Sequence, residues 1–212
     1  FVYVLDAKDG TLLSGNTFGK VNWATGIDMK TGRPIVTEVF TSAIDGKNVT
    51  VWPSVSGVTN WQHLSFSPRT GMLYVNTLHV GMTYEAPEPP KLTPGAPSGA
   101  GTVKRTVVTD DPNVRGFLKA IDPMTGKSKW EYFVKDGEKM LDHPSLALEL
   151  PNGNVVVNDD ARHRVIVIDR ATKEIVWQYG VTDKPGHGPN ELFFPDGVDI
   201  DVFRDWRPTS AR

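Results

Sequence analysis

The densest group of residues able to do chemistry is Asn158-Asp159-Asp160, followed closely by Arg162 and His163. Carboxylates can ligate a hard cation or accept a proton, and a histidine can exchange protons near neutral pH. Asp159, Asp160 and His163 are therefore the candidate catalytic residues of a hydrolase. The alternative role is structural, with the carboxylates capping a turn and pairing with nearby arginines. The sequence favours this structural role, because carboxylate–arginine networks are common in such turns.

Other catalytic patterns are missing from the sequence. The five histidines have no ligand spacing such as H-x-x-x-H, and the absence of cysteine excludes disulfides and thiolate metal sites. Ser145 lacks the glycines of a nucleophile elbow, so an esterase serine is not expected. Residues 126–128 (GKS) lack the first glycine of a phosphate-binding loop. The sequence therefore predicts no metal site.

Short β-strands are the elements that must position these residues. One pattern of strand, Asp, tight turn and strand occurs three times, at residues 1–14 (FVYVLDAKDGTLLS), 117–132 (FLKAIDPMTGKSKWEY) and 164–179 (RVIVIDRATKEIVWQY). The aspartate can accept hydrogen bonds from the backbone of the turn, and a glycine can supply a positive φ where the chain reverses. The spacing predicts propeller blades, each about 40–50 residues long.

Four residues set the details of this repeat. Asp122 and Asp169, which open the second and third turns, lie 47 residues apart (169 − 122), close to the length of one blade. Trp130 and Trp177 follow the same two turns. We expect both indoles to pack between neighbouring sheets, because each can bury a large apolar area.

Two segments interrupt the repeat. Gly26–Glu38 (GIDMKTGRPIVTE) carries a similar turn but follows the first copy too closely to be a complete blade. Residues 84–112 are rich in Pro, Gly, Ser and Thr, which predicts a long inserted, flexible loop. The fold class predicted for residues 1–212 is a single all-β domain of about four propeller blades, some of them incomplete.

Composition and the first residues restrict the classes of function. The formal net charge of -2 gives no global field that would attract nucleic acid or anionic lipid. No apolar run approaches the roughly 18 residues that a membrane span needs. The chain opens directly on a strand-like run, Phe1–Leu5, without a methionine or a signal peptide. We therefore expect a processed chain or a fragment.

Residues 22–34 (NWATGIDMKTGRP) resemble the pyrroloquinoline quinone (PQQ) dependent methanol and ethanol dehydrogenases. The likeness continues through residues 57–75 (GVTNWQHLSFSPRTGMLYV) and 116–131 (GFLKAIDPMTGKSKWE), in the order of that family, so it covers about residues 1–134. It implies an eight-bladed propeller that holds PQQ and Ca²⁺ near its axis, where the metal acts as a Lewis acid and a carboxylate takes the proton of the alcohol.

The same resemblance implies a cofactor-binding role for Asn60 and Trp61. In that family the Asn-Trp pair borders the cofactor pocket, so the amide of Asn60 would hydrogen-bond the quinone and Trp61 would form a wall. The alternative is that Asn60 ends a turn and Trp61 lies in the blade core.

The sequence also departs from this family. The family's calcium carboxylate and its catalytic aspartate lie N-terminal to the matched stretch, and its vicinal disulfide has no counterpart here. The resemblance therefore implies a fragment or relative of a PQQ-dependent alcohol dehydrogenase that binds PQQ, lacks the calcium carboxylate and does not oxidise alcohols alone. It also implies a periplasmic location.

The C-terminal part resembles NHL-type propeller repeats over about residues 142–201. The likeness rests on His163-Arg164 and on residues 194–198 (FPDGV). A junction near 135–143 would separate quinoprotein-like blades (1–134) from an NHL-like blade and strand (142–212). Alternative functions are therefore an NHL-like binding or scaffold propeller, and a hydrolase with a polar site at the propeller axis.

Open strand edges expose unpaired backbone groups, which must be covered. Either Phe1–Leu5 pairs with C-terminal strands of the same chain and closes a small ring, or two chains associate toward an eight-bladed ring. We expect the homodimer, with a small-molecule ligand near the axis and neither nucleic acid nor a membrane as partner.

Overall fold

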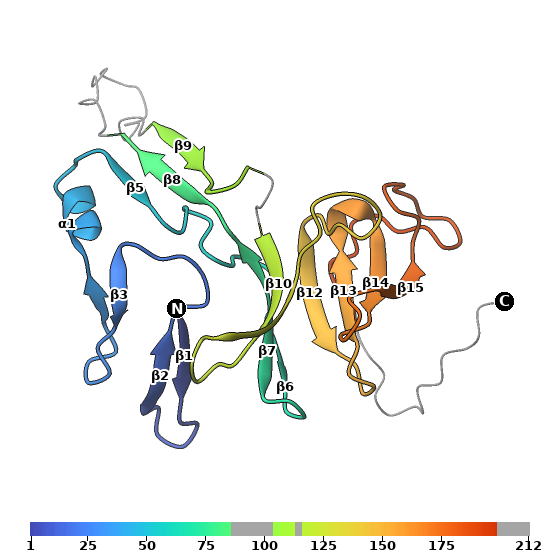
Figure 1. The fold of residues 1–212 in the computed structure, drawn as a ribbon, viewed down its shortest axis with the longest axis horizontal. Coiled ribbons are helices and arrows are strands. Elements are labelled where there is room, and N and C mark those ends of the chain that lie inside the picture. The colour runs from blue at the N-terminus through green and yellow to red at the C-terminus, as the bar shows by residue number, and fades with distance from the viewer. Residues whose placement is uncertain (86–103, 113–115, 199–212) are drawn as a thin grey trace, which may run out of the picture.

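Two four-stranded antiparallel sheets form the centre of the computed structural model (Figure 1). The structure describes residues 1–85, 104–112 and 116–198. The first blade has the strand order β11-β10-β7-β6 and the second the order β12-β13-β14-β15. The first comprises β6 (Ser65–Ser67), β7 (Met72–Leu78), β10 (Gly116–Ile121) and β11 (Ser128–Tyr132). The second comprises β12 (Pro144–Glu149), β13 (Val155–Asp159), β14 (Arg164–Ile168) and β15 (Ile175–Tyr179).

The residues before the first blade form smaller elements. β1 (Val2–Leu5) pairs with β2 (Leu12–Asn16), and β3 (Ala24–Ile27) pairs with β4 (Pro34–Val36). The β3–β4 hairpin is the segment that the sequence placed too early for a complete blade, and it is indeed only two-stranded. The short helix α1 (Glu38–Ile44) follows it and buries none of its residues.

A three-stranded sheet extends the first blade outward. It pairs β8 (Gly81–Tyr84) with β5 (Val49–Val51) on one side and β9 (Arg105–Val108) on the other. Because β8 follows β7 and β9 precedes β10, the two middle strands of the first blade continue into this sheet. The segment expected as a loop over 84–112 thus starts at the last residue of β8 and contains β9, while residues 86–103 lie outside the described residues.

The aspartate turns form as the sequence predicts. Each turn opens with an aspartate whose carboxylate accepts a hydrogen bond from the backbone N–H two residues later. The distances are 2.8 Å for Asp6, 2.9 Å for Asp122 and 3.0 Å for Asp169. Asp28, in the β3–β4 hairpin, makes the same contact at 2.8 Å. The positive-φ position of each turn is held by Gly10, Gly32, Gly126 and Lys173.

The main hydrophobic core lies between the two blades. Its fully buried residues come from both sheets: Tyr74, Leu118, Ala120 and Tyr132 from the first, and Ala147, Val155, Val157, Ile166 and Ile168 from the second. Trp130 packs against this core, and its indole Nε1 donates to the carbonyl of Arg170 at 2.8 Å. The prediction that Trp130 packs between sheets is therefore confirmed.

The equivalent prediction for Trp177 is wrong. The indole of Trp177 is 49% exposed, because no further sheet covers that face of the second blade within the described residues. The small closed ring is wrong for a related reason. β1 pairs with β2, and β15 pairs with β14, so the first and last strands do not pair with each other and the described sheets stay open (Figure 1). The fold is an incomplete β-propeller.

No helix among the described residues is long and apolar enough to cross a membrane.

Candidate ligand-binding site

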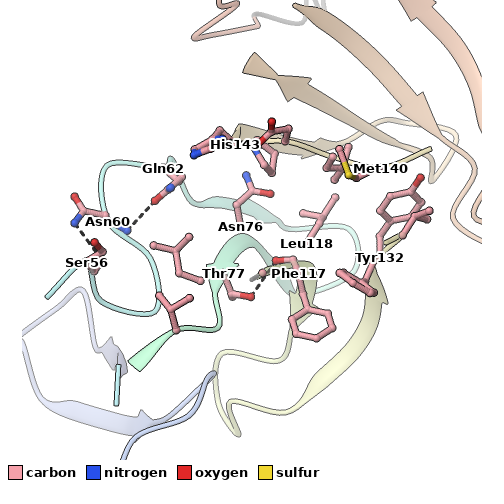
Figure 2. A pocket seen from close by; sticks show the side chains of 18 of the residues that line it. Ser56, Asn60, Gln62, Asn76, Thr77, Phe117, Leu118, Tyr132, Met140 and His143 are labelled. Atoms are coloured by element: carbon pink, nitrogen blue, oxygen red, sulfur yellow. Dashed lines mark hydrogen bonds and ion pairs between the residues drawn. The ribbon is translucent and has the colours of Figure 1, made fainter. Parts of the chain in front are cut away.

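A cavity of about 710 Å³ opens where the two blades meet (Figure 2). Leu78, the last residue of β7, pairs with Gly116, the first residue of β10, and Leu118 pairs with Tyr132, the last residue of β11. The antiparallel register therefore brings these three strand termini to the same edge of the first blade. The start of β12 lies at the same edge, and the segments before β6 and before β12 complete the wall. Four separate stretches of the chain, within residues 56–62, 76–80, 107–118 and 132–144, therefore line one cavity.

Asn60 and Trp61 both line this cavity. Asn60 Nδ2 donates to the carbonyl of Ser56 at 3.1 Å, and the backbone N–H of Asn60 donates to Gln62 Oε1 at 2.8 Å (Figure 2). These bonds fix the loop, and no hydrogen bond to the Oδ1 atom of Asn60 is present among the described residues. The indole of Trp61 is 53% exposed, so it does not lie in the blade core. This placement is the one that a cofactor-binding role requires, and that role stays a prediction.

The inner walls of the cavity are largely apolar. The rings of Phe117 and Phe133 lie 5.3 Å apart at 49° on one face of the first blade, and Leu118 and Tyr132 line the cavity from the other face. The hydroxyl of Tyr132 donates to the carbonyl of Lys139 at 2.5 Å, and burial raises the pKa of Tyr132 to about 12. Tyr132 is thus an uncharged residue of the cavity lining, and its hydroxyl also holds the segment before β12 in place.

Asn76 is the least expected residue of this wall. It lies on β7, is 4% exposed, and neither its Oδ1 nor its Nδ2 has a hydrogen-bond partner among the described residues. Alternation along β7 places it on the same face as Met72 and Tyr74, both of which contact the core. A polar side chain thus occupies a position that the strand pattern assigns to an apolar one.

Asp142 and His143 form a hydrogen-bonded pair on the lining of the cavity. His143 Nδ1 lies 2.5 Å from Asp142 Oδ1, and both side chains are exposed to solvent. His143 has a positive φ of 52°. A carboxylate bound to one ring nitrogen orients the imidazole and leaves the other nitrogen for a ligand or a proton.

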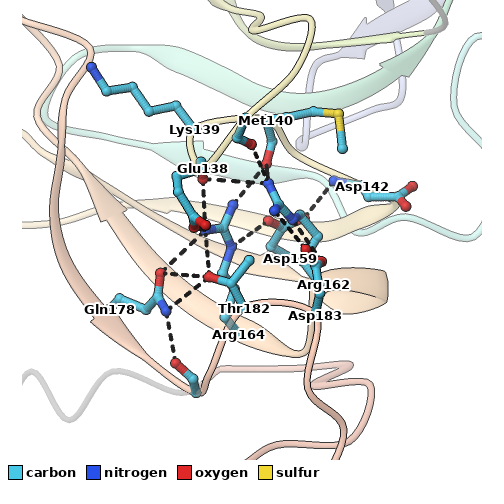
Figure 3. A network of polar contacts seen from close by, with 12 residues as sticks. Glu138, Lys139, Met140, Asp142, Asp159, Arg162, Arg164, Gln178, Thr182 and Asp183 are labelled. Atoms are coloured by element: carbon cyan, nitrogen blue, oxygen red, sulfur yellow. Dashed lines mark hydrogen bonds and ion pairs between the residues drawn. The ribbon is translucent and has the colours of Figure 1, made fainter.

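Asp159 lies behind the cavity wall and does not line the cavity. Arg164 Nε donates to its carboxylate at 2.8 Å, and the backbone N–H of Asp142 donates to it at 2.7 Å (Figure 3). Burial raises the pKa of Asp159 to about 6, while Arg164 and the backbone bond act against that shift. Asp159 therefore positions the cavity-lining segment through the backbone of Asp142.

Two arginines extend this network to the same segment. Arg164 donates to the carbonyls of Glu138 and Met140, each at 2.8 Å. Arg162 donates to the carbonyl of Gly137 at 2.7 Å and to both carboxylate oxygens of Asp183 at 3.0 and 2.9 Å. Of the arginine pairing expected from the sequence, the Asp159–Arg164 pair forms, whereas Arg162 pairs with Asp183. Together these contacts fix the wall of the cavity (Figure 3).

Asp160 and His163 are buried at the same end of the second blade, away from the cavity lining. The hydroxyl of Ser145 donates to Asp160 at 2.7 Å, and burial raises the pKa of Asp160 to about 6. The ring of His163 packs against Phe193 and Phe194, and its Nδ1 accepts the backbone N–H of Phe194 at 3.3 Å. Neither residue lines this cavity, so the cavity lends no support to the hydrolase hypothesis.

Within the described residues, no group of three or more His, Asp or Glu side chains could hold a metal ion.

Sequence reasoning placed Asn60 and Trp61 at the cavity but missed Asn76, Asp142 and His143. The signal for Asn76 was available, because an asparagine interrupts the apolar alternation of Met72, Tyr74 and Leu78. Asp142 and His143 follow no catalytic spacing and reach the cavity only through the fold.

The cavity and the open series of blades together define the ligand-bearing end of an incomplete propeller. No model of a known protein family matches the sequence. Individual proteins do match it. The chain is 34% identical over 131 residues to quinohemoprotein alcohol dehydrogenase ADH IIB of Pseudomonas putida, which covers 62% of this chain and 19% of that protein. It is 36% identical over 139 residues to the lanthanide-dependent methanol dehydrogenase of Methylorubrum extorquens, covering 61% and 23%.

A longer match links the chain to quinohemoprotein alcohol dehydrogenase ADH-IIG of Pseudomonas putida, at 31% identity over 193 residues, 84% of this chain and 25% of that protein. Among solved structures, the quinohemoprotein alcohol dehydrogenase of Comamonas testosteroni superposes with a TM-score of 0.60 at 28% identity, over 85% of this chain and 27% of that chain. A structure of ADH-IIG superposes with a TM-score of 0.62 at 26% identity, over 83% and 26%.

The chain is a fragment or relative of the quinoprotein alcohol dehydrogenase propeller. It spans about a quarter or less of the length of the curated relatives described above.

Proposed function

We propose that the cavity at the end of the two blades forms one wall of a PQQ site. The observation that carries this proposal is the position of Asn60 and Trp61, which the cavity brings together with an aromatic wall formed by Phe117 and Phe133. Sites for flat organic cofactors are usually concave and apolar, with a few polar groups that fix orientation.

The residues present fit a flat aromatic acid in part. Asn60, with its Oδ1 uncommitted, would hydrogen-bond the edge of the cofactor, and the half-exposed indole of Trp61 would cover one face. Lys135, also on the lining, would pair with a carboxylate. One lysine is few for a cofactor with several carboxylates, so residues beyond this chain would supply the remaining cations.

When bound, PQQ supplies the two-electron acceptor for alcohol oxidation. The part proposed for this chain is to bind and orient the cofactor and to exclude water from one side of it. By the resemblance, the catalytic aspartate and the calcium carboxylate come from blades outside the matched stretch. We therefore expect binding of PQQ without turnover of alcohols by the isolated chain, in a periplasmic setting like that of the family it resembles.

Some observations support a single propeller origin for the whole chain over an NHL-like second half. The match to ADH-IIG covers 84% of the chain, a share that residues 1–134 alone could not supply. The second blade also shares one core with the first.

A second copy of this chain is the partner that we propose for the open edges of β1 and β15. Each of these strands has one unpaired edge among the described residues, and apolar side chains near both are exposed: Tyr3, Leu5 and Leu13 near β1, and Val176, Trp177 and Tyr179 near β15. Sedimentation equilibrium at micromolar protein should give twice the chain mass. A single-chain mass throughout would contradict the dimer and leave the cofactor proposal standing.

Quenching of tryptophan fluorescence tests the cofactor site. PQQ absorbs in the near ultraviolet, so its binding beside Trp61 should quench that indole. We expect Trp61→Phe to remove most of the saturable quenching and Trp177→Phe, a change at an exposed indole away from the cavity, to preserve it. Equal quenching in the two variants, or no saturable quenching, would contradict the proposal.

A further inference from the structure

The amide of Asn76 lies at the inner end of the cavity with both of its polar atoms unpartnered among the described residues. Asn76 is paired with Leu118 on β10, and Leu118 with Tyr132 on β11, so the three side chains form one row across the first blade. Figure 2 shows the amide standing between Leu118 and Gln62, directed toward the segment that carries Met140 and His143. The row is the boundary between the core and the cavity.

A buried amide without partners is costly, since it has lost water and gained no hydrogen bond in exchange. The next residue inward on the same face, Tyr74, belongs to the hydrophobic core, so a leucine at position 76 would suit the packing. The unpartnered amide therefore makes the free protein less stable than an apolar residue would. Such a cost is typical of a group whose partner is a ligand.

The chemistry of the amide restricts that ligand. Its carbonyl accepts and its NH₂ donates, side by side in one plane, so the best complement is a planar group that offers a donor next to an acceptor. A lactam or a primary carboxamide does so without charge, whereas a carboxylate has no hydrogen to donate. The walls on the same face of the blade, Leu118 and Tyr132, suit a flat and uncharged ring.

We propose that Asn76 anchors a binding subsite for a flat, uncharged lactam or carboxamide at the inner end of this cavity. The subsite rests on the described cavity and on the unpartnered amide, and it does not depend on PQQ. Failure of PQQ to bind would leave it intact, and failure of a lactam to bind while PQQ binds would overturn it alone.

The test uses the whole chain and two probes that differ by one hydrogen-bond donor. 2-Pyridone carries a ring N–H beside its carbonyl, and N-methyl-2-pyridone does not. We expect 2-pyridone to bind with a Kd of about 1 mM or tighter by ligand-observed NMR, as a good fragment can, and N-methyl-2-pyridone to bind at least about tenfold more weakly. Equal binding of the two probes, or no binding of 2-pyridone at about 10 mM, would overturn the subsite.

Variants give a second, independent readout. Asn76→Leu should abolish binding of 2-pyridone and raise the melting temperature by about 2 °C or more, because it removes the unpartnered polar atoms. Asn158→Leu is the matched control, since Asn158 is also buried and its Oδ1 is also unpartnered among the described residues, but its Nδ2 donates to the carbonyl of Pro195 at 2.8 Å and it lies outside the cavity lining. It should melt at a lower temperature and still bind the probe. Unchanged affinity in Asn76→Leu would show that solvent satisfies the amide, and would overturn the proposal.

Discussion

Glycine has different roles at equivalent positions of two aspartate turns. Gly10 and Gly126 both have a positive φ, 78° and 69°. A Cβ atom on Gly10 would meet nothing within 4 Å, whereas one on Gly126 would lie 2.2 Å from the carbonyl oxygen of Thr17. Thr17 directly follows β2, so the turn of the first blade docks against the preceding sheet.

Gly10→Ala and Gly126→Ala should therefore differ in stability. Gly10→Ala introduces only the strain of a non-glycine residue at positive φ, about 1 kcal/mol. Gly126→Ala adds a clash with backbone and should cost about 3 kcal/mol or more. Urea denaturation of the two variants measures the difference. Equal losses of unfolding free energy would show that the turn of the first blade does not dock on β2 in solution.

Asp160 should make stability fall as the pH rises. Its pKa is about 6 in the folded protein against 3.8 without the fold, because burial disfavours the charged form. The folded state therefore holds the proton more tightly, and the stability that this provides is present below about pH 4 and lost by about pH 6.

Asp160→Asn should remove this pH dependence while keeping an oxygen for the Ser145 hydroxyl. As the pH rises from 4 to 7, the unfolding free energy of the variant relative to that of the wild type should increase by on the order of 2 kcal/mol. Asp169→Asn is the control with the opposite sign, because hydrogen bonds from Thr172 and Ala171 lower the pKa of Asp169. A pH-independent difference for Asp160→Asn would contradict the assignment.

Some residue roles follow from sequence and others only from the fold. The aspartate turns are local, since the carboxylate reaches a backbone N–H two residues away, and the sequence alone predicts them. The placement of Asn76 depends on which face of β7 meets the second blade. Asp142 reaches the cavity because Asp159 and Arg164, far along the chain, hold its segment. Long-range contacts of this kind produce no residue spacing in the sequence from which they could be predicted.

Strands and blades are predictable where alternation and turns are strong. The three repeated segments give β1–β2, β10–β11 and β14–β15. Helix α1 was not expected, because a seven-residue helix that buries no side chain has no apolar periodicity. The extension of the first blade by β8 and β9 was also not expected, since loop-like composition lies next to these strands.

Trp130 and Trp177 are equivalent in the repeat but not in their surroundings. Trp130 is packed against the core shared by the two blades, and Trp177 is half exposed on the outer blade. Trp130→Ala should cost about 3 kcal/mol, because it opens a cavity between sheets and leaves the carbonyl of Arg170 without its donor. Trp177→Ala should cost less than about 1 kcal/mol.

Chemical denaturation at low protein concentration, where association is minimal, measures both variants. If the two variants lost similar amounts of unfolding free energy, some part of the isolated chain would have to cover Trp177. That result would contradict the exposed face of the second blade.

On the scale of the whole molecule, the chain is an open arc of a propeller. Its relatives are several times longer, and the described sheets do not close on themselves. The sequence predicted the propeller class because the blade repeat is local. It could not predict how the ring ends, because closure depends on contacts between the first and last strands, which the repeat does not encode. The cavity is lined by the first blade and by the segments before β6 and before β12, so it can form without closure.

Calorimetric titration of the chain with PQQ, with and without Ca²⁺, tests the central claim most directly. We expect a Kd of about 1 μM or tighter, near -8 kcal/mol, and weakening of at least about tenfold in Asn60→Ala. Calcium should change the affinity little, because no group of metal ligands is present among the described residues. An absence of binding heat at several temperatures, or an affinity unaffected by Asn60→Ala, would mean that the chain keeps the propeller scaffold without its cofactor site.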